Sequence, residues 1–258
     1  MEAGAAVLNE SVIYLPQVGS TNAWAKENIA QFGPVGAVYT TDQTAGRGRL
    51  GRGWVDAPGK GLYYTAVIKT DLAQPSTLPL FASLAVCDAL KQRYGIDCQI
   101  KWPNDLLLNG KKIVGILCEV APDGHSLVVG IGINLAQPQE YFDMAGLPHG
   151  TSLVLEGLTV NDPMIEQLAA AYAEELTGPR FAVWAAEGFA PFLEEYRALC
   201  INLGRPVKFE GGQGVAEQVD EEGRLIVRTE AGEQKVFTGE VSVKGVYEDI
   251  ERTERTPR

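Results

Sequence analysis

The sequence predicts an α/β protein in which helices back a mixed, largely antiparallel sheet, with a small all-β unit near the C-terminal end. Three observations carry this prediction. Strand-like runs before residue 203 are linked by hairpin signals more often than by helices, an apolar helical stretch lies at 77–95, and short strand-like runs divided by glycine turns follow residue 203. With 258 residues, of which 45% are hydrophobic, the chain is long enough to bury a large core.

The first part of the chain alternates helices and strands. Ser20 or Thr21 can cap a helix, and Pro34 prevents that helix from continuing beyond Gly33. A second helix has a broad apolar face and is expected to end at Gly95, because glycine readily adopts the left-handed conformation that closes a helix. The elements expected here are a helix at 22–32, strands at 36–41 and 61–70, and the helix at 77–95.

Three further strands and two helices are expected before residue 203. The dipeptide Asn109-Gly110 is the strongest short hairpin signal in the chain and is expected to join the first two of these strands. In the second strand, side-chain alternation would place Lys112 and Val114 on one face and Ile113 and Gly115 on the other. The strands are expected at 98–102, 111–120 and 126–135, and the helices at 162–177 and 181–199.

The residues after 203 are typical of a second, smaller domain. Short strand-like runs separated by glycine-containing turns predict a small β-barrel, and they lie at 205–210, 214–220, 224–230, 233–239 and 241–247. We therefore expect a first domain at 1–202, a β domain at 203–250 and a tail at 251–258.

Charge and cysteine content restrict the class of protein. The formal net charge is -11, since 33 acidic residues outnumber 22 basic ones, and a nucleic acid is therefore not an expected partner. The sequence shows neither a signal peptide nor a long apolar run, so we expect a cytoplasmic protein without a membrane anchor. The cysteines are widely spaced and are expected to be small core residues rather than a disulfide framework or a zinc site: Cys87, Cys98, Cys118 and Cys200.

A glycine- and arginine-rich loop at 40–54 is the first candidate binding element. It places Arg47, Arg49 and Arg52 among four glycines, so that backbone N–H groups and guanidinium groups could surround a ligand with more than one negative group. Its spacing matches neither the P-loop nor the dinucleotide-binding loop. A solvated basic loop or a contact with RNA remains the alternative interpretation of these residues.

The segment from Lys101 to Lys112 is the second candidate. The hairpin is expected to bring both lysines to the same end of the sheet, together with the amide of Asn104 and the carboxylate of Asp105. Two lysines and an aspartate at one rim suit a polyphosphate and a magnesium ion. The alternative is a hairpin tip whose lysines are solvated.

Five segments, taken in order, resemble those of biotin protein ligases, also called biotin–[acetyl-CoA-carboxylase] ligases. They are GSTN (19–22), QTAGRGRLGRGW (43–54), KWPND with the following KKIVGIL (101–117), GIGINL (130–135) and GEVSVKG (239–245). The resemblance covers about residues 12 to 247. It implies a catalytic domain like that of class II aminoacyl-tRNA synthetases followed by an SH3-like barrel. It also implies an ATP-dependent enzyme that forms biotinyl-5'-AMP and transfers biotin to a lysine of a biotin carboxyl carrier protein.

The resemblance also implies roles for individual residues. Lys112 and Arg49 are the implied catalytic residues, and Lys112 would reach the biotin carboxylate and the α-phosphate. The implied biotin-binding residues are Ser20, Thr21, Asn22, Gln43, Gly46, Arg47, Gly48, Arg49, Lys112, Gly115, Gly130 and Gly132. The implied ATP-binding residues are Arg49, Arg52, Trp54, Lys101, Asn104, Asn134 and Lys244, with Trp54 covering the adenine. Asp105 is the implied magnesium ligand, and a flexible Gly-Arg loop would close over the adenylate and shield it from water.

Two departures from the family pattern affect these expectations. The GSTN segment already begins at Gly19, so we expect neither the N-terminal DNA-binding domain of some relatives nor DNA binding. Lys244 stands where relatives have arginine, and a lysine offers the adenylate a point charge instead of a planar fork. A homodimer is possible for this family. A lipoate ligase of the same fold, an RNA-binding module and a protein that only sequesters biotin remain the alternative functions.

Overall fold

The computed structural model describes residues 12–49, 53–54, 57–237, 239 and 241–246. A seven-stranded sheet forms its centre, with the strand order β1-β2-β3-β7-β6-β5-β4. β1 and β2 pair in parallel and every other neighbouring pair is antiparallel, which confirms the mixed, largely antiparallel sheet. The strands are β1 (Val12–Tyr14), β2 (Val35–Thr40), β3 (Gly61–Ile68), β4 (Gln99–Lys101), β5 (Asp105–Leu108), β6 (Lys111–Val120) and β7 (Leu127–Asn134).

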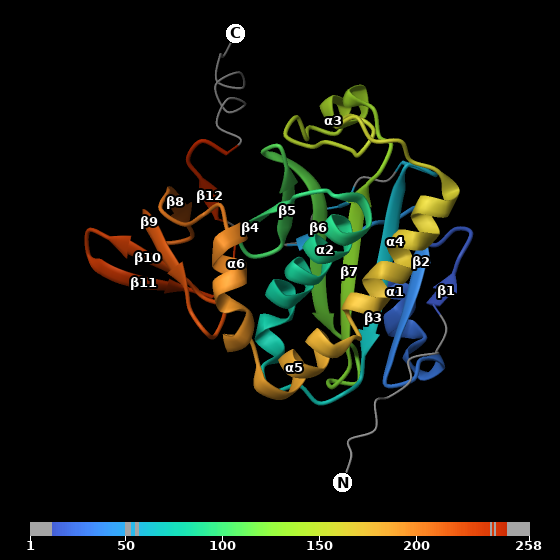
Figure 1. The fold of residues 1–258 in the computed structure, drawn as a ribbon, viewed down its shortest axis with the longest axis horizontal. Coiled ribbons are helices and arrows are strands. Elements are labelled where there is room, and N and C mark those ends of the chain that lie inside the picture. Colours follow the sequence, from blue (N-terminus) through green and yellow to red (C-terminus); the bar gives the residue numbers. More distant parts are fainter. Residues whose placement is uncertain (1–11, 50–52, 55–56, 238, 240, 247–258) are drawn as a thin grey trace.

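Helices cover both faces of this sheet. α2 and α4 pack against each other and against one face, over the larger part of the buried core (Figure 1). α1 contacts β2, β3 and β7 on the opposite face, where Ala25 and Phe32 form a separate apolar cluster with strand valines. The helices are α1 (Thr21–Glu27), α2 (Leu78–Tyr94), α3 (Gln139–Met144), α4 (Asp162–Glu175), α5 (Pro179–Glu187) and α6 (Leu193–Leu199), with short 3-10 turns η1 (Ile29–Gln31), η3 (Pro75–Thr77) and η4 (Ala190–Phe192).

Two expected helix ends are confirmed, whereas the helix expected at 22–32 ends at Glu27 and is followed by the separate 3-10 turn η1. The Ser20 hydroxyl accepts a hydrogen bond from the N–H of Ala23 and begins α1, and the Asn161 side chain accepts one from Met164 and begins α4. Gly95 ends α2 with φ +65°, as predicted. The helix predicted at 181–199 is wrong as a single element, because Gly188 with φ +77° separates α5 from η4 and α6.

The hairpin at Asn109-Gly110 is confirmed, but it joins a different strand from the one expected. Both residues have positive φ, at 50° and 78°, as a tight hairpin turn requires. The strand before the turn is β5, which sequence analysis assigned to a connection between the strands at 98–102 and 111–120. β1 and α3 were not predicted either.

The C-terminal sheet is antiparallel throughout, with the order β11-β10-β9-β8-β12. Its strands are β8 (Pro206–Phe209), β9 (Gly212–Val219), β10 (Leu225–Thr229), β11 (Gly232–Val236) and β12 (Ser242–Val243). They correspond to the five strand-like runs that the sequence predicts after residue 203. Apolar residues of this sheet belong to the same buried cluster as those of the main sheet, so the division between 202 and 203 stays a prediction.

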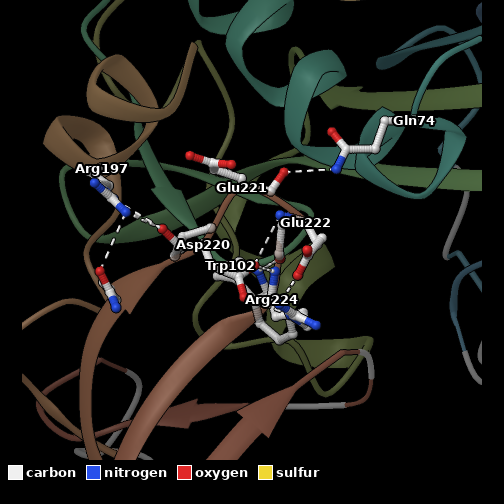
Figure 2. A network of polar contacts seen from close by, with 10 residues as sticks. Gln74, Trp102, Arg197, Asp220, Glu221, Glu222 and Arg224 are labelled. Carbon is white, nitrogen blue, oxygen red and sulfur yellow. Dashed lines mark hydrogen bonds and ion pairs between the residues drawn. The ribbon is translucent and has the colours of Figure 1, made fainter. Parts of the chain in front are cut away.

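Buried hydrogen bonds fix the C-terminal sheet against the end of β4. The indole Nε1 of Trp102 donates to the carbonyl of Gly223 at 3.0 Å, and the Trp102 N–H donates to Asn202 Oδ1 at 2.8 Å. Figure 2 shows the turn at 220–224 against Trp102 and Gln74, whose Nε2 donates to the Glu221 carbonyl at 2.9 Å. Within the part of the chain that the structure describes, no helix combines the length and hydrophobicity needed to cross a membrane.

Candidate active site

A cavity of about 1440 Å³ lies on the α1 side of the main sheet, and residues of the C-terminal sheet complete its wall. Its lining includes most of the residues selected from the sequence: Ser20, Thr21, Asn22, Gln43, Arg47, Gly48, Arg49, Trp54, Lys101, Asn104, Asp105, Lys112, Gly115, Gly130, Gly132, Asn134 and Lys244. Gly46 does not line it, but its carbonyl accepts a hydrogen bond from the N–H of Trp54 at 3.0 Å. Arg52 lies outside the described residues.

One part of the cavity lining is built by the start of α1 and by Gln43, which are joined by hydrogen bonds. We call this part the polar end, and it consists of Ser20, Thr21, Asn22 and Gln43. All four residues are buried. The Gln43 Oε1 accepts from the Thr21 backbone N–H at 3.0 Å and from the Thr21 hydroxyl at 3.3 Å. The side-chain orientation of this glutamine is therefore set by the protein.

Asn22 is held by three hydrogen bonds. Its Nδ2 donates to the Leu117 carbonyl at 3.2 Å and to Glu119 Oε2 at 2.9 Å, and its Oδ1 accepts from the Thr65 hydroxyl at 2.7 Å. A Cβ on Gly130 would lie 2.3 Å from that Oδ1. The glycine at 130 therefore provides space for Asn22 itself, a role that sequence analysis did not assign.

The Gly-Arg loop reaches from the main sheet toward the C-terminal sheet. Arg47 and Gly53 form an isolated bridge across the loop. Arg49 Nη1 donates to Asn104 Oδ1 at 2.7 Å, and its Nη2 donates to the Gly239 carbonyl at 3.2 Å. The Arg49 guanidinium thus links the loop, the KWPND segment and the connection between β11 and β12.

Lys112 lines the cavity and contacts side chains from two other segments. Its Nζ is 2.6 Å from Asp105 Oδ1 and 5.6 Å from the centroid of the Trp54 ring. The Trp54 indole packs against Gly115 and Gly132. A Cβ atom would lie 2.5 Å from the indole at Gly115 and 3.0 Å from it at Gly132. These two glycines therefore make room for the indole.

The expected alternation around Lys112 is wrong. The register between β5 and β6 shifts between Leu106 and Leu107, which pair with Val114 and Lys112 respectively and leave Ile113 as the extra residue. Because a β-bulge inserts one residue, side-chain alternation slips at that point. Lys112 consequently lies on the same face as Gly115, not on that of Val114.

The fit of the site to a magnesium ion depends on Asp105. The carboxylate of Asp105 is already paired with Lys112. No group of three or more His, Cys, Asp or Glu side chains with the geometry of a metal site occurs among the described residues. Within the described residues, the cavity lining therefore offers magnesium the carboxylates of Asp105 and Glu230 and no preformed cage.

Sequence analysis missed two parts of the site. Residues of the segment 141–150, among them Tyr141 and Phe142, line the cavity. Sequence analysis missed them because the short helix in this segment gives no strong periodic signal. His149 belongs to this segment, and its carbonyl accepts from the Lys112 N–H at 2.8 Å. Burial, with Lys112 and Lys101 nearby, lowers the pKa of His149. Glu119 is the other missed residue, because a glutamate in an apolar strand gives no hint of its distant partner.

The four cysteines take no part in this arrangement. All are free thiols, and Cys87, Cys98 and Cys200 are buried while Cys118 is half-buried. Burial raises the pKa of Cys98 and of Cys118 to about 12, so these thiols stay protonated at neutral pH. The prediction of core residues is confirmed for the three buried cysteines.

Comparison with known proteins gives consistent results. Residues 14–135 match the biotin/lipoate A/B protein ligase family, and residues 203–244 match the biotin protein ligase C terminal domain. The biotin–[acetyl-CoA-carboxylase] ligase of Paracoccus denitrificans is 34% identical over 90% of this chain and 100% of its own length. The bifunctional ligase/repressor BirA of Bacillus spizizenii is 30% identical over 92% of this chain and 75% of its own length. A biotin protein ligase from Aquifex aeolicus, solved in complex with biotin and ATP, superposes with a TM-score of 0.74 at 30% identity, covering 91% of this chain and 99% of that one.

Proposed function

The chain belongs to the biotin protein ligase family, and on that premise we propose how its own residues bind the substrates and carry out the ligation. The enzyme is a biotin–[acetyl-CoA-carboxylase] ligase that uses ATP. In the first step a biotin carboxylate oxygen attacks the α-phosphorus of ATP, which forms biotinyl-5'-AMP and expels pyrophosphate. In the second step the ε-amine of an acceptor lysine attacks the carbonyl carbon of the mixed anhydride, and AMP leaves.

The roles are assigned from the way in which the residues are arranged around one cavity. It brings a buried polar end and a cationic centre together from segments as far apart as Ser20 and Lys244. A ligand with a small polar ring at one end and a carboxylate at the other fits this polarity. We therefore assign the ureido ring of biotin to the polar end and its carboxylate to the neighbourhood of Lys112.

Lys112 and Arg49 supply positive charge where two anions must meet. A carboxylate and a triphosphate repel each other, so preorganised cations lower the barrier most when they are fixed before the reaction begins. Asp105 holds the Lys112 ammonium at 2.6 Å, and Asn104 holds Arg49 at 2.7 Å. Both cations are thus already oriented in the protein.

The nucleotide belongs on the side of the cavity formed by Trp54, Lys101, Asn134 and Lys244. Trp54 offers a flat apolar surface to the adenine, and Lys101 and Lys244 offer charge to the phosphates. Arg52 extends this set by family resemblance alone. Magnesium would neutralise the charge of the leaving pyrophosphate. We propose that it binds together with ATP and that Asp105 is its protein ligand, because Mg²⁺ in such sites is coordinated mostly by phosphates and water.

The acceptor that we propose is a biotin carboxyl carrier protein or domain, as the names of the relatives suggest. We infer a cytoplasmic location from the supply of ATP and from the pattern of widely spaced cysteines. The net charge of -11 argues against nucleic acid as a ligand. A homodimer is part of the proposal only by analogy with the family.

The transfer step tests this function. The protein is incubated with ATP, magnesium, biotin and a purified carrier domain, and the carrier mass is measured. We expect a gain of one biotinyl group at a single lysine, and no gain when lipoate replaces biotin. Lipoylation of the carrier would favour the alternative ligase, and an unmodified carrier with both acids would favour a protein that only sequesters biotin.

A further inference from the structure

A line of polar side chains runs from the surface to the polar end of the cavity. Lys26 Nζ lies 2.7 Å from Glu119 Oε1, and Glu119 Oε2 accepts from Asn22 Nδ2 at 2.9 Å. The side chains of Lys26 and Glu119 are only 17% and 26% exposed. We call Lys26, Glu119, Asn22 and Thr65 the Asn22 network; only Asn22 among them lines the cavity.

The network determines which atom of the Asn22 amide faces the cavity. Nδ2 has two donor hydrogens, and both of its partners, the Glu119 carboxylate and the Leu117 carbonyl, can only accept. A flipped amide would place Oδ1 against two acceptors, which is unfavourable. Oδ1 must therefore face Thr65 and the space above Gly130, and Gly130 itself lines the cavity.

Neighbouring side chains stabilise the ionised form of Glu119. Burial alone would raise the pKa of Glu119, but hydrogen bonds from Lys26 and Asn22, with Arg47 nearby, bring that pKa below its ordinary value. The carboxylate is therefore an obligate acceptor at neutral pH. Lys26 keeps it ionised and in place, so the orientation of Asn22 depends on a pair that does not touch the ligand space.

We propose that Glu119, held by Lys26, is a positioning residue that presents Asn22 to the cavity as a hydrogen-bond acceptor for a ureido N–H of biotin, and thereby selects biotin over lipoate. This inference rests on the proposed placement of the ureido ring at the polar end. The ureido ring carries two N–H donors, whereas the dithiolane ring of lipoate carries none. A buried acceptor left without a donor disfavours binding, so the Asn22 oxygen rejects the wrong acid as well as binding the right one.

Glu119→Gln is the informative variant because it nearly keeps the shape of the side chain. A neutral glutamine cannot satisfy both neighbours: whichever way its amide points, one of its N–H groups faces Lys26 or Asn22 Nδ2. The orientation of Asn22 is then no longer determined. We expect the KM for biotin to rise by about 10-fold or more, as for the loss of a hydrogen bond in a buried site, while the KM for ATP stays unchanged.

Three further variants separate positioning from a general loss of structure. Lys26→Arg keeps the charge and should retain most of the biotin affinity. Adding Glu119→Gln to Asn22→Ala should have no further effect on the KM for biotin, because the glutamate acts through Asn22. Glu195→Gln is the matched control, since it removes a carboxylate that pairs with Arg180 at 2.8 Å outside the cavity lining.

The measurement is biotin-dependent exchange of radiolabelled pyrophosphate into ATP, with both KM values determined for each protein. An unchanged KM for biotin in Glu119→Gln, or equal rises in the KM for biotin and for ATP, would overturn the positioning role. A further loss in the Asn22→Ala background would also overturn it. If the unaltered protein shows no biotin-dependent exchange, the proposed function itself fails, and this outcome is distinct from the others.

Discussion

Removal of the Lys112 ammonium tests whether this single charge promotes adenylate formation. Lys112→Met keeps an unbranched side chain beside the Trp54 ring but deletes the charge that lies 2.6 Å from Asp105. The Lys112 side chain is 25% exposed and that of Asp105 is 16% exposed, so water only partly compensates for the loss. The variant therefore removes a positive charge from the place where the carboxylate and the α-phosphate must meet.

Two effects of different size are expected. Loss of one preorganised donor to a charge that develops in the transition state costs about 2.7–4 kcal/mol, which is about a 10²- to 10³-fold fall in rate. The folded state loses less, about 1–3 kcal/mol, because Asp105 is left without its partner in a half-buried position. The rate of adenylate formation should therefore fall far more than the stability of the fold.

The assay is single-turnover formation of biotinyl-AMP from labelled ATP, with urea unfolding of the same samples. Lys111→Met is the matched control, since Lys111 is the exposed neighbour in β6. It should form adenylate at the rate of the unaltered protein. A folded Lys112→Met protein that forms adenylate within a few-fold of that rate would refute the role assigned to Lys112.

Three other substitutions test separate parts of the account. Arg49→Gly removes the link to Asn104 and to the Gly239 carbonyl, so adenylate should still form but dissociate faster and modify bystander lysines; an unchanged dissociation rate would contradict a clamping role. Trp102→Phe leaves the buried Gly223 carbonyl without its donor and should lower the free energy of unfolding by about 1–3 kcal/mol, measured in urea; an unchanged value would contradict this. His149 has a pKa below 6.5 in the folded protein, so the unfolded chain binds its proton more readily and stability falls as pH drops below 6.5. His149→Asn should reduce this loss, measured as the difference in melting temperature between pH 8 and pH 5, and an equal difference in both proteins would contradict the assignment.

Local signals predicted much of the fold because each depends on neighbouring residues. The capping hydroxyl of Ser20, the left-handed Gly95 and the Asn109-Gly110 turn all appear where the sequence placed them. β5 was missed because its four residues lie between two turn signals and are too short to show alternation. Its existence depends on pairing with β4 and β6, which is information from outside the segment.

Candidate site residues were found through motifs, whereas their partners were not. Lys112 was selected correctly as a cavity residue, but its face was wrong since a bulge near Ile113 depends on register with β5. Glu119 is 97 residues from Asn22, and nothing local marks it as a partner. Long-range contacts of this kind are set by the packing of α1 on the sheet.

Pyrophosphate exchange with different acids is the most direct test of the central claim. The purified protein is incubated with ATP, magnesium and labelled pyrophosphate, with biotin, with lipoate or with neither acid. The account predicts rapid incorporation of label into ATP with biotin and not with lipoate or without an acid. Both acids carry a carboxylate for Lys112, but biotin also carries an N–H donor for the polar end. Exchange that is equal with lipoate, or that proceeds without either acid, would contradict it.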